Sequence, residues 1–544
     1  MEIESNFIKT IMEEDLKSNK VESIITRFPP EPNAYLHIGH ARAIITNFEL
    51  AKIFGGKTNL RFDDTNPVKE DSSFVEAIKE DIKWLGYDPA NILFGSDYFN
   101  QTYDLAIKLI NKGLAFVCDL NQEEMREYRG SLIKSGENSP FRNRSVEENL
   151  TLFEEMKQGK YKDGEKTLRA KIDMSSPNMN MRDPVIYRII HIEHHNTGNK
   201  WCIYPMYDFA HPLQDAIEGV THSLCSLEYD DHRVLYDWVV EKCEMPHVPH
   251  QYEFGRLNIT NTIMSKRYLK QLVEAKLVRG YDDQRMPTLT GLRRRGYTRD
   301  SIRNFVLGTG LSRINSTVSS EMLETSVRSD LNYKVKRVNA IIDPLNVTIT
   351  NYPEDKIEWM NVEYNRDNEE IGIRKIAFGR NVYIERTDFL EVKPNKKWKR
   401  LSLGIEVRLM HAYFIKCNEI VRDNEGNIVE LLCTYDPKTK SGSGFKDRKP
   451  NGNIQFVEAT QGIPAEINLF EPLMVDSDSK RDIKERLNPS SWKTMNGYVE
   501  SSLKNTFKLE RFQFIRNGYF CTDYDSKEGK LIFNRICELR SSFK

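Results

Sequence analysis

The sequence predicts a multidomain protein in which an α/β part built on a parallel sheet precedes an all-β part. Three observations support this fold class. The chain has 544 residues, which is too long for a single hydrophobic core. Its N-terminal part alternates strand-like and helix-like segments, as parallel sheets require. Beyond about residue 336 the pattern changes to short alternating strands separated by Gly, Asn and Asp turns.

Two strand–helix units open the α/β part. Residues 21–28 are apolar and β-branched and end at two prolines, so we expect a strand. Residues 40–56 have apolar side chains at helical spacing and end in a double glycine, as a helix C-terminus does. Residues 57–65 are expected to form a second strand, and a helix capped by Asp71 or Ser72 follows it. Such sheets bind ligands beyond the carboxyl ends of their strands.

The remaining pattern divides the chain further. A mixed segment interrupts the α/β alternation, which then resumes, and a helical, basic segment precedes the strands. We expect the following parts: the first half of a Rossmann-type sheet (1–100), an inserted domain (101–206), the second half of the sheet (207–260), a helical subdomain (261–335) and two antiparallel β-barrels (336–544).

The composition excludes several classes of protein. Hydrophobic residues make up 39% and charged residues 29%, and no apolar run approaches the roughly 20 residues of a membrane span. The N-terminus is too charged for a secretory signal. The eight cysteines are scattered without a C-x-x-C pair, which argues against a disulfide framework and a cysteine-rich zinc site. We therefore expect a cytoplasmic protein with reduced thiols, no membrane association and no bound zinc.

Two basic stretches lie far apart in a chain whose net charge is −1. Residues 256–303 contain twelve Lys and Arg against four Asp and Glu, and residues 393–400, KPNKKWKR, include a tryptophan. Either stretch alone could be a solvated surface. Two such stretches with interleaved aromatics favour a long polyanion, because clustered Lys and Arg neutralise phosphates. Nucleic acid is therefore the expected partner.

The sequence RFPPEPNAYLHIGHAR places His37 and His40 around Gly39 at the expected start of a helix. Backbone N–H groups and the positive end of the helix dipole favour an anion there, and Gly39 allows it to approach closely. Two imidazoles three residues apart can donate to the same phosphate oxygens. The tetrapeptide alone also fits a structural pair or half of a metal site.

A second candidate phosphate site, TIMSKRYL, follows about 225 residues later. Ser265, Lys266 and Arg267 precede an expected helix, where a mobile lysine can stabilise charge on a departing pyrophosphate. Alone, such a basic loop is commonplace. The combination of the two histidines with this loop is more informative than either.

Two other stretches fail as sites on the sequence alone. FGGKT resembles the end of a P-loop, but the position of the first required glycine is Ala51. HIEHH offers His191, Glu193 and His195 on one face if it is extended, but it lacks the helical H-E-x-x-H spacing and a fourth ligand. No metal site is therefore expected.

Eight motifs carry a resemblance that covers nearly the whole chain. They are RFPPEPNAYLHIGHA, LRFDDTNP, YPMYDFAH, GVTHSLCSLEY, QYEFGRLN, IMSKR, RMPTLTGLRRRGY and FIRNGYFC. Together they resemble the class I aminoacyl-tRNA synthetases, and within them the glutaminyl-tRNA synthetases of the glutamyl/glutaminyl subfamily. Glutamyl enzymes share the HIGH region of the first motif, and their eukaryotic-type form also shares RFPPE. Features that separate the two groups are Pro32-Asn33, Met206, His211 and the two-barrel C-terminal region.

The resemblance implies the residues that bind ATP and glutamine. The implied catalytic residues are His37, His40 and Lys266. The implied ATP-binding residues are Glu31, Asn33, His37, Gly39, His40, Arg256, Leu257, Met264, Ser265 and Lys266. The implied glutamine-binding residues are Arg27, Asp63, Tyr207, His211 and Gln251. A site built to hydrogen-bond a neutral amide can reject a charged analogue by up to ~10⁴–10⁵. Tyr207 alone would otherwise be interpreted as an ordinary core tyrosine.

The resemblance also implies tRNA contacts. The inserted domain would bind the acceptor end and the barrels the anticodon. The implied residues are Asp231, Arg337, Lys397, Lys399, Arg400, Arg408, Gln513 and Arg516. A carboxylate such as Asp231 can accept from an exocyclic amino group, and unstacked anticodon bases suit hydrogen bonding on their edges. Lys397 departs from the family's usual residue, as do Ala34 and Arg42.

The implied reaction has two steps. Glutamine and Mg-ATP give glutaminyl adenylate and pyrophosphate, and the 2′-hydroxyl of the terminal adenosine of tRNA(Gln) then takes the glutaminyl group. Positioning and charge stabilisation suffice for both steps. We expect a monomer with tRNA, glutamine and ATP as partners. The alternatives are a two-barrel glutamyl-tRNA synthetase and a tRNA-binding paralogue without catalysis.

Overall fold

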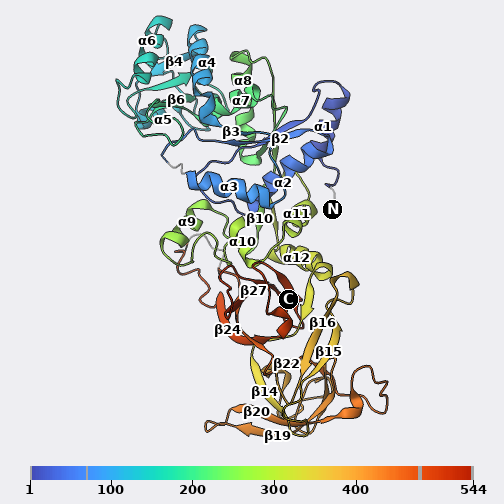
Figure 1. The fold of residues 1–544 in the computed structure, drawn as a ribbon. Helices are drawn as coiled ribbons and strands as arrows, with labels where there is room; N and C mark the ends of the chain where they lie inside the picture. The colour runs from blue at the N-terminus through green and yellow to red at the C-terminus, as the bar shows by residue number, and fades with distance from the viewer. Residues whose placement is uncertain (1–2, 69–71, 476–480, 541–544) are drawn as a thin grey trace. The chain divides into compact units, whose positions relative to one another are not determined.

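The computed structural model describes residues 3–68, 72–475 and 481–540 (Figure 1). The chain forms two compact units. The first contains Met1–Ile259 and Arg303–Val318, and the second contains Thr260–Ile302 and Ser319–Lys544. Each unit is described by itself.

The first unit is built on parallel strands, as predicted. These strands are β1 (Ile25–Phe28), β2 (Lys57–Phe62), β3 (Ile92–Phe94), β8 (His222–Ser226) and β9 (His250–Phe254). β1, β2 and β3 pair in parallel in that order, and β8 pairs in parallel with β9. The backbone N–H of Thr221 donates to the carbonyl of Ile25 at 2.9 Å, so the start of β8 lies beside the start of β1. The two halves of the predicted Rossmann-type sheet therefore lie next to each other.

Helices precede, separate and follow the strands of this unit. They are α1 (Phe7–Lys17), α2 (Ile38–Ile53), α3 (Ser72–Trp84), α4 (Phe99–Asn111), α5 (Gln122–Arg129), α6 (Val146–Lys157), α7 (Tyr207–Ile217) and α8 (Arg233–Lys242). α2 packs on β1 and β2. It stops where Gly55 takes a φ of +63° and where a Cβ on Gly56 would lie 2.1 Å from the carbonyl oxygen of Ile24. FGGKT is thus a helix stop, as predicted. Asp71, one of the two predicted caps, lies outside the described residues.

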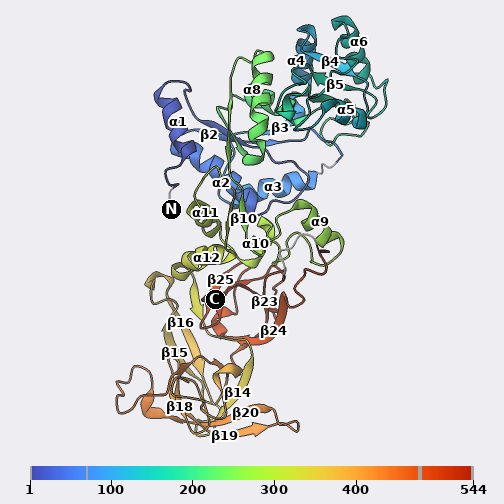
Figure 2. The same cartoon turned by 180° about the vertical axis from the view of Figure 1, so that it is seen from behind.

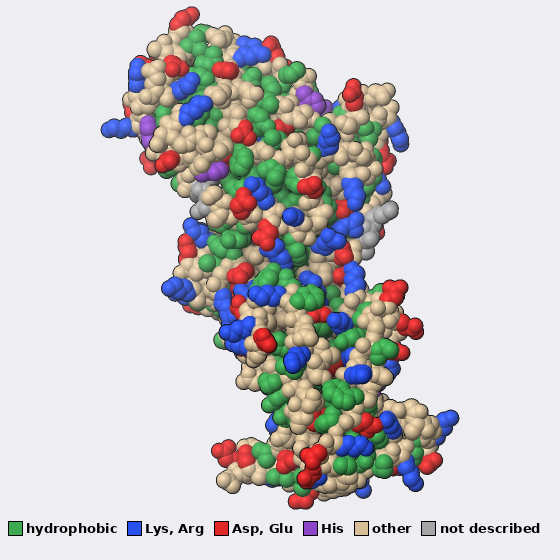
Figure 3. Space-filling view, in the orientation of Figure 1, with side chains coloured by type: hydrophobic (Ala, Val, Ile, Leu, Met, Phe, Trp, Pro, Cys, Tyr) green, Lys and Arg blue, Asp and Glu red, His purple; other side chains and the backbone are tan. Residues whose placement is uncertain are grey.

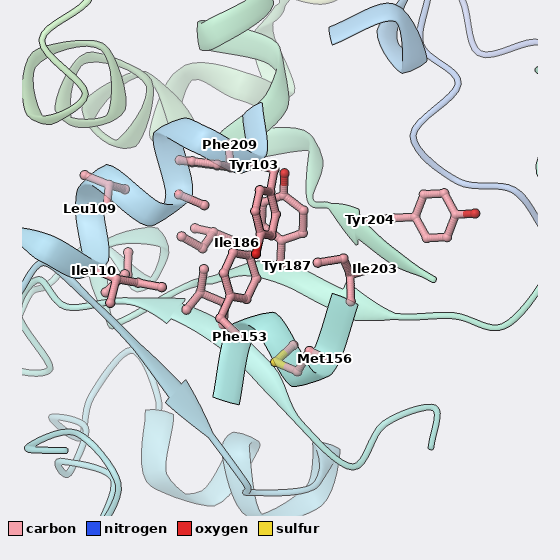
Figure 4. Close-up of a cluster of buried hydrophobic side chains, with 14 of the residues drawn as sticks. Tyr103, Leu109, Ile110, Phe153, Met156, Ile186, Tyr187, Ile203, Tyr204 and Phe209 are labelled. Atoms are coloured by element: carbon pink, nitrogen blue, oxygen red, sulfur yellow. The ribbon is translucent and has the colours of Figure 1, made fainter. Parts of the chain in front are cut away.

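A separate antiparallel sheet is inserted between the two halves. Its strands, in order of pairing, are β4 (Ala115–Cys118), β5 (Thr167–Ala170), β6 (Val185–Ile189) and β7 (Ile203–Pro205). Figure 4 shows its core, where Tyr103, Phe153 and Tyr187 cluster with Phe209 from α7. Leu235 and Val239 of α8 belong to the same core. The insertion is therefore fixed to the second half of the parallel sheet by a continuous hydrophobic cluster.

Short strands and helices follow the parallel sheet. They are β10 (Leu257–Ile259), α9 (Lys266–Glu274), α10 (Leu289–Arg295), α11 (Arg299–Gly308), β11 (Ser316–Val318) and α12 (Ser320–Lys334). The predicted helical character of this stretch is confirmed. α10 ends at Gly296, which has a φ of +110° and a left-handed conformation that favours glycine.

The rest of the second unit is all-β, as predicted. Its strands are β12 (Lys336–Val338), β13 (Ala340–Ile341), β14 (Pro344–Ile349), β15 (Glu358–Glu363), β16 (Ile373–Phe378), β17 (Asn381–Glu385), β18 (Glu406–Leu409), β19 (Phe414–Arg422), β20 (Ile428–Asp436), β21 (Asn453–Ile454), β22 (Val457–Glu458), β23 (Ile463–Phe470), β24 (Trp492–Val499), β25 (Arg511–Phe514), β26 (Gly518–Thr522) and β27 (Leu531–Cys537).

Most of these strands form two seven-stranded, barrel-like sheets. One has the order β21-β18-β19-β20-β14-β17-β22, part of which is labelled in Figure 2, and the other has the order β12-β25-β26-β27-β23-β24-β13. Val347, Ile384 and Leu431 lie in the core of the first, and Phe514 and Phe533 in that of the second.

Both sheets also contain parallel neighbours in addition to the predicted antiparallel ones. The parallel neighbours are β12 with β25, β14 with β20, β18 with β21, and β23 with β27. Strands joined by a short hairpin, such as β19 and β20, must run antiparallel. Strands far apart in sequence are free of that constraint, and hairpin patterns cannot reveal their direction.

The surface carries both signs of charge. Figure 3 shows Lys and Arg interspersed with Asp and Glu over the face in view. Within the described part of the chain, no helix is long and apolar enough to cross a membrane.

Candidate functional site

His37 and His40 form a reciprocal cap at the start of α2. The Nδ1 atom of His37 accepts from the backbone N–H of Gly39 at 3.0 Å, and the Nδ1 atom of His40 accepts from the backbone N–H of His37 at 3.1 Å. The ring centroids lie 3.9 Å apart. A neutral imidazole has only one acceptor nitrogen, so each ring carries its proton on Nε2. Both rings thus present an N–H donor beside the positive end of a helix, which suits a phosphate.

The loop before α2 approaches the carboxyl end of β2. The backbone N–H of Asp63 donates to the carbonyl of Pro30 at 2.9 Å, and the side chain of Asn33 donates to that of Glu31. Ala34 has no left-handed φ, as expected of a residue other than glycine. The predicted ATP loop and the predicted glutamine residue Asp63 are therefore adjacent.

Asp63 has an unusual electrostatic environment. Burial and then the nearby Glu31 raise the pKa of its carboxyl to about 6, while a hydrogen bond from Thr65 at 3.0 Å opposes the shift. The carboxylate is ionised at neutral pH in a partly desolvated site, where its attraction for an ammonium is stronger than in water.

Arg27 lies beneath this region with its side chain 0% exposed. Its Nε atom contacts Asp215 at 3.1 Å and its Nη1 atom donates to the carbonyl of Leu224 at 2.7 Å. Its Nη2 atom lies 2.6 Å from both the ring of His211 and the hydroxyl of Ser223. All three guanidinium nitrogens therefore contact protein partners.

Asp215 is the counter-charge of this buried group. It also contacts Arg61 at 2.7 Å, Ser223 at 2.6 Å and Tyr236 at 2.9 Å. Burial opposes its ionisation, but Arg27 and the other cations outweigh that penalty and hold the pKa of Asp215 well below its ordinary value. Sequence reasoning missed this residue. Its position four residues after His211, on the same face of a helix, could have indicated that the two side chains interact.

His211 and Tyr207 lie on the first turns of α7. Their rings stack with centroids 4.8 Å apart. Burial lowers the pKa of His211 far below its ordinary value, with Arg27 and Arg61 adding to the shift, so the ring is neutral. Burial likewise raises the pKa of the Tyr207 hydroxyl, and Arg27 and Asp63 both act on that hydroxyl electrostatically. The structure thus brings together Arg27, Asp63, Tyr207 and His211.

Gln251 and Arg256 lie farther along the same half of the sheet. The amide nitrogen of Gln251, on β9, donates to the carbonyl of Tyr229 at 3.1 Å and to Glu253 at 3.0 Å. Tyr229 in turn packs against Tyr207 with ring centroids 5.1 Å apart, which links Gln251 to the predicted glutamine residues. The half-exposed Arg256 pairs with Glu228 and precedes Leu257, the first residue of β10.

The MSKR residues belong to the second unit. α9 begins at Lys266, with Ser265 as its N-cap residue and Met264 before it, so the lysine lies in the first turn of a helix. Its side chain is exposed. Lys266 and Arg267 were expected in a loop before the helix, but they are its first two residues.

A cavity of about 450 Å³ in the second unit contains two predicted anticodon residues. Arg337 and Gln513 are direct partners in the β12–β25 pair, and both line the cavity with Arg366, Arg374 and His411. Arg337 also pairs with Asp367. Sequence reasoning missed Arg366, Arg374 and His411, because only the pairing of distant strands brings them beside Arg337.

The other predicted tRNA residues lie on the first seven-stranded sheet or its loops, except Arg516, which lies in the turn between β25 and β26 of the second. Arg400 and Arg516 share the buried carboxylate of Asp388, at 3.3 and 2.8 Å. Lys397 and Lys399 are exposed beside Trp398. The Nη1 atom of Arg408 donates to Ala412 O, Thr439 O and Ser441 Oγ.

Two further features are Asp231, which lies between β8 and α8, and an apolar pair on the inserted part. Asp231 is exposed, and its carbonyl accepts from the side chain of Asn178 at 2.7 Å. Leu132 and Ile133 are 83% and 100% exposed in the loop after α5, and Arg182 holds this loop through the carbonyls of Ser131 and Lys134. The sequence analysis did not identify this apolar pair, although two consecutive apolar residues within a polar segment could have indicated it.

HIEHH is not an extended strand. His191 pairs with Asp163 at 2.6 Å on the surface, whereas His194 and His195 lie in a turn beside Asp64. The imidazoles of His194 and His195 and the carboxylate of Asp64 have candidate ligand atoms within 4.8 Å of one another. His191 is therefore not part of the same group as His195, and the group of candidate ligands around His195 includes Asp64 instead.

Comparison with known proteins identifies related chains over the full length. Family descriptions of "tRNA synthetases class I (E and Q), catalytic domain" match residues 23–333, and two "anti-codon binding domain" descriptions match residues 335–436 and 453–523. A "Glutamine--tRNA ligase" of Clostridium kluyveri is 57% identical over 99% of this chain and 98% of its own length. One of Clostridium perfringens is also 57% identical over the same shares. A crystal structure of a glutamate tRNA ligase from Elizabethkingia meningosepticum aligns at 16% identity over 57% of this chain and 70% of its own, with a TM-score of 0.42.

Proposed function

The chain belongs to the class I (E and Q) tRNA synthetases, and we propose that it ligates glutamine to tRNA with ATP, as its 57% identical relatives are named for doing. The observation that carries this proposal is the adjacency of two chemistries in the first unit. The paired Nε2–H donors of His37 and His40 suit the phosphates of ATP. Asp63, held to the same loop through Pro30, suits the ammonium of an amino acid.

Activation requires that the amino-acid carboxylate attack the α-phosphorus of ATP. His37 and His40 would stabilise the charge that develops on the phosphate oxygens, and Lys266 that on the departing pyrophosphate. Glu31, Asn33, Gly39, Arg256, Leu257, Met264 and Ser265 would complete the ATP site. The Mg²⁺ that accompanies ATP is part of the substrate, and no side-chain nucleophile takes part.

Selection of glutamine over glutamate follows from charge compensation. The guanidinium of Arg27 is neutralised by Asp215 and contacts protein partners through all three nitrogens, so a substrate carboxylate gains little from it. Asp63 and Glu31 lie close enough to interact, and together they repel a second anion. The neutral hydroxyl of Tyr207 suits an uncharged amide. His211 stacks on the ring of Tyr207, and Gln251 is linked to it through Tyr229.

The tRNA would contact both units. Asp231 would accept from a base in the acceptor stem, and the cavity around Arg337 and Gln513 would hold an anticodon base. Lys397, Lys399, Arg400, Arg408 and Arg516 would bind phosphates or base edges around it. Accordingly, 101–206 would be the acceptor-end-binding domain and 336–544 the anticodon-binding region. The enzyme would act in the cytoplasm as a monomer.

Exchange of labelled pyrophosphate into ATP tests the catalytic proposal. We expect exchange that requires both glutamine and tRNA. Absence of exchange with active tRNA and either amino acid would instead support a tRNA-binding paralogue without catalysis. Exchange that occurs with glutamate but not with glutamine, in the presence of tRNA, would support the glutamyl alternative.

A further inference from the structure

Asp64, the residue after Asp63, is the centre of a buried hydrogen-bond cluster that the reaction does not use directly. Its side chain is 0% exposed. Its Oδ1 atom accepts from the backbone N–H of Ser96 at 2.7 Å, and its Oδ2 atom accepts from the Ser96 hydroxyl at 2.6 Å. The same Oδ2 atom lies 3.0 Å from Nε2 of His195. The end of β2 is thus tied both to the segment after β3 and to the inserted part.

His194 makes a second connection to the same residue. Its Nδ1 atom accepts from the backbone N–H groups of Asn196 and Thr197, at 3.1 and 3.2 Å. Burial lowers the pKa of His194, so the ring is neutral and its proton lies on Nε2. That Nε2–H donates to the carbonyl of Asp64 at 2.7 Å. His194 therefore fixes the backbone immediately after Asp63, while His195 fixes the side chain.

The turn that carries both histidines is closed by its own hydrogen bonds. The backbones of His194 and Gly198 exchange two hydrogen bonds, at 3.0 and 2.8 Å. The side chain of Asn196 donates to the Ser96 hydroxyl at 2.8 Å, which closes a ring of contacts around Asp64. We propose that His194 and His195 are positioning residues, which act through Asp64 to hold Asp63 where it binds the ammonium of the amino acid. This role rests on the proposed function of Asp63.

The same atoms also satisfy the distance criterion for a metal site, but their hydrogen bonds disfavour one. A metal ligated by Nε2 of His194 would replace the proton that this nitrogen donates to Asp64. The Asp64 carboxylate would have to give up contacts from Ser96, and breaking buried hydrogen bonds is costly. The cluster is thus better suited to holding a backbone than a cation.

The test compares His195→Ala with His191→Ala in the full-length chain. His191 also pairs with an aspartate of the insertion, Asp163, but at the surface and away from Asp64. We expect His195→Ala to raise KM for glutamine about tenfold or more in tRNA charging, because small misplacements of binding groups are costly. KM for ATP should stay within about twofold. His191→Ala should change neither value.

Two conservative variants keep the test decisive even if His195→Ala does not fold. Glutamine can place its amide nitrogen near the position of histidine Nε2, whereas asparagine reaches only the position of Nδ1. His195→Gln should therefore bind glutamine nearly as well as the wild type, and His195→Asn should resemble the alanine variant. A general loss of stability would not produce this order.

Three results would overturn the positioning role. One is an unchanged KM for glutamine in both His195→Ala and His195→Asn. Another is an equal rise in KM for ATP and glutamine. The third is one zinc per wild-type chain, measured by metal analysis, that His195→Ala removes. A wild-type chain that does not charge glutamine would instead refute the proposed function, so the two failures can be told apart.

Discussion

Arg27 and Asp215 form an ion pair in which both side chains are fully buried, with Nε and Oδ1 3.1 Å apart. The pair lies under the predicted amino-acid site, and Arg61 shares the same carboxylate at 2.7 Å. Arg61 also pairs with the buried Glu218 at 3.1 Å, whereas Asp215 is the anion paired with Arg27. This arrangement stabilises a specific geometry beneath Tyr207 and His211, and it makes Asp215 sensitive to substitution.

Asp215→Asn should destabilise the first unit strongly. Removing one partner of a buried pair leaves an uncompensated charge and typically costs about 3–5 kcal/mol. Denaturant unfolding measures the loss. The matched control is Asp163→Asn, which removes a surface partner of His191 and should cost less than about 1 kcal/mol. Equal effects of the two substitutions would contradict the structural role of Asp215.

His40→Asn separates capping from catalysis. The asparagine oxygen can occupy the position of Nδ1 and accept the backbone N–H of His37, but it provides no donor at Nε2. We expect a melting temperature close to that of the wild type and pyrophosphate exchange slowed ~10²-fold or more. Lys266→Ala should show a similar loss of exchange. Near-normal exchange in both variants would remove these residues from the mechanism.

The dependence of glutamine binding on pH should reflect Asp63. Its carboxyl has a pKa raised to about 6, chiefly by burial and next by Glu31. The ionised form binds the ammonium, so kcat/KM for glutamine should be full well above pH 6 and should fall as the pH decreases through that value. Glu31→Gln, assayed at saturating ATP, should move this acidic limb to lower pH. If the acidic limb of the pH profile does not move in Glu31→Gln, the limb reflects the ionisation of a group other than Asp63.

Arg337→Ala should weaken tRNA binding through the cavity that this residue shares with Gln513. Loss of one base contact is worth about 1–3 kcal/mol, so KM for tRNA should rise roughly fivefold to a hundredfold. Arg422→Ala is the control, because Arg422 pairs with Glu391 in an exposed contact. KM for ATP should be unchanged in both variants. A similar rise in KM for tRNA in the control would show a nonspecific charge effect.

The sequence was sufficient for features encoded locally. Helical spacing and the double glycine located α2, and the end of β2 located Asp63, because these signals depend on neighbouring residues. Mixed pairing in the C-terminal sheets could not be predicted, since β14 and β20 are joined by a long segment that fixes no direction. The contacts of Asp64 with His195 and of Arg27 with Asp215 were equally hidden, because they join residues 131 and 188 positions apart.

Discrimination between glutamine and glutamate tests the central claim most directly. The measurement is kcat/KM for the charging of one tRNA with each amino acid, under the same conditions. Because the site pairs its own charges and offers a neutral hydroxyl to the substrate amide, we predict a preference for glutamine of about 10⁴. Equal charging, or faster charging with glutamate, would contradict the account.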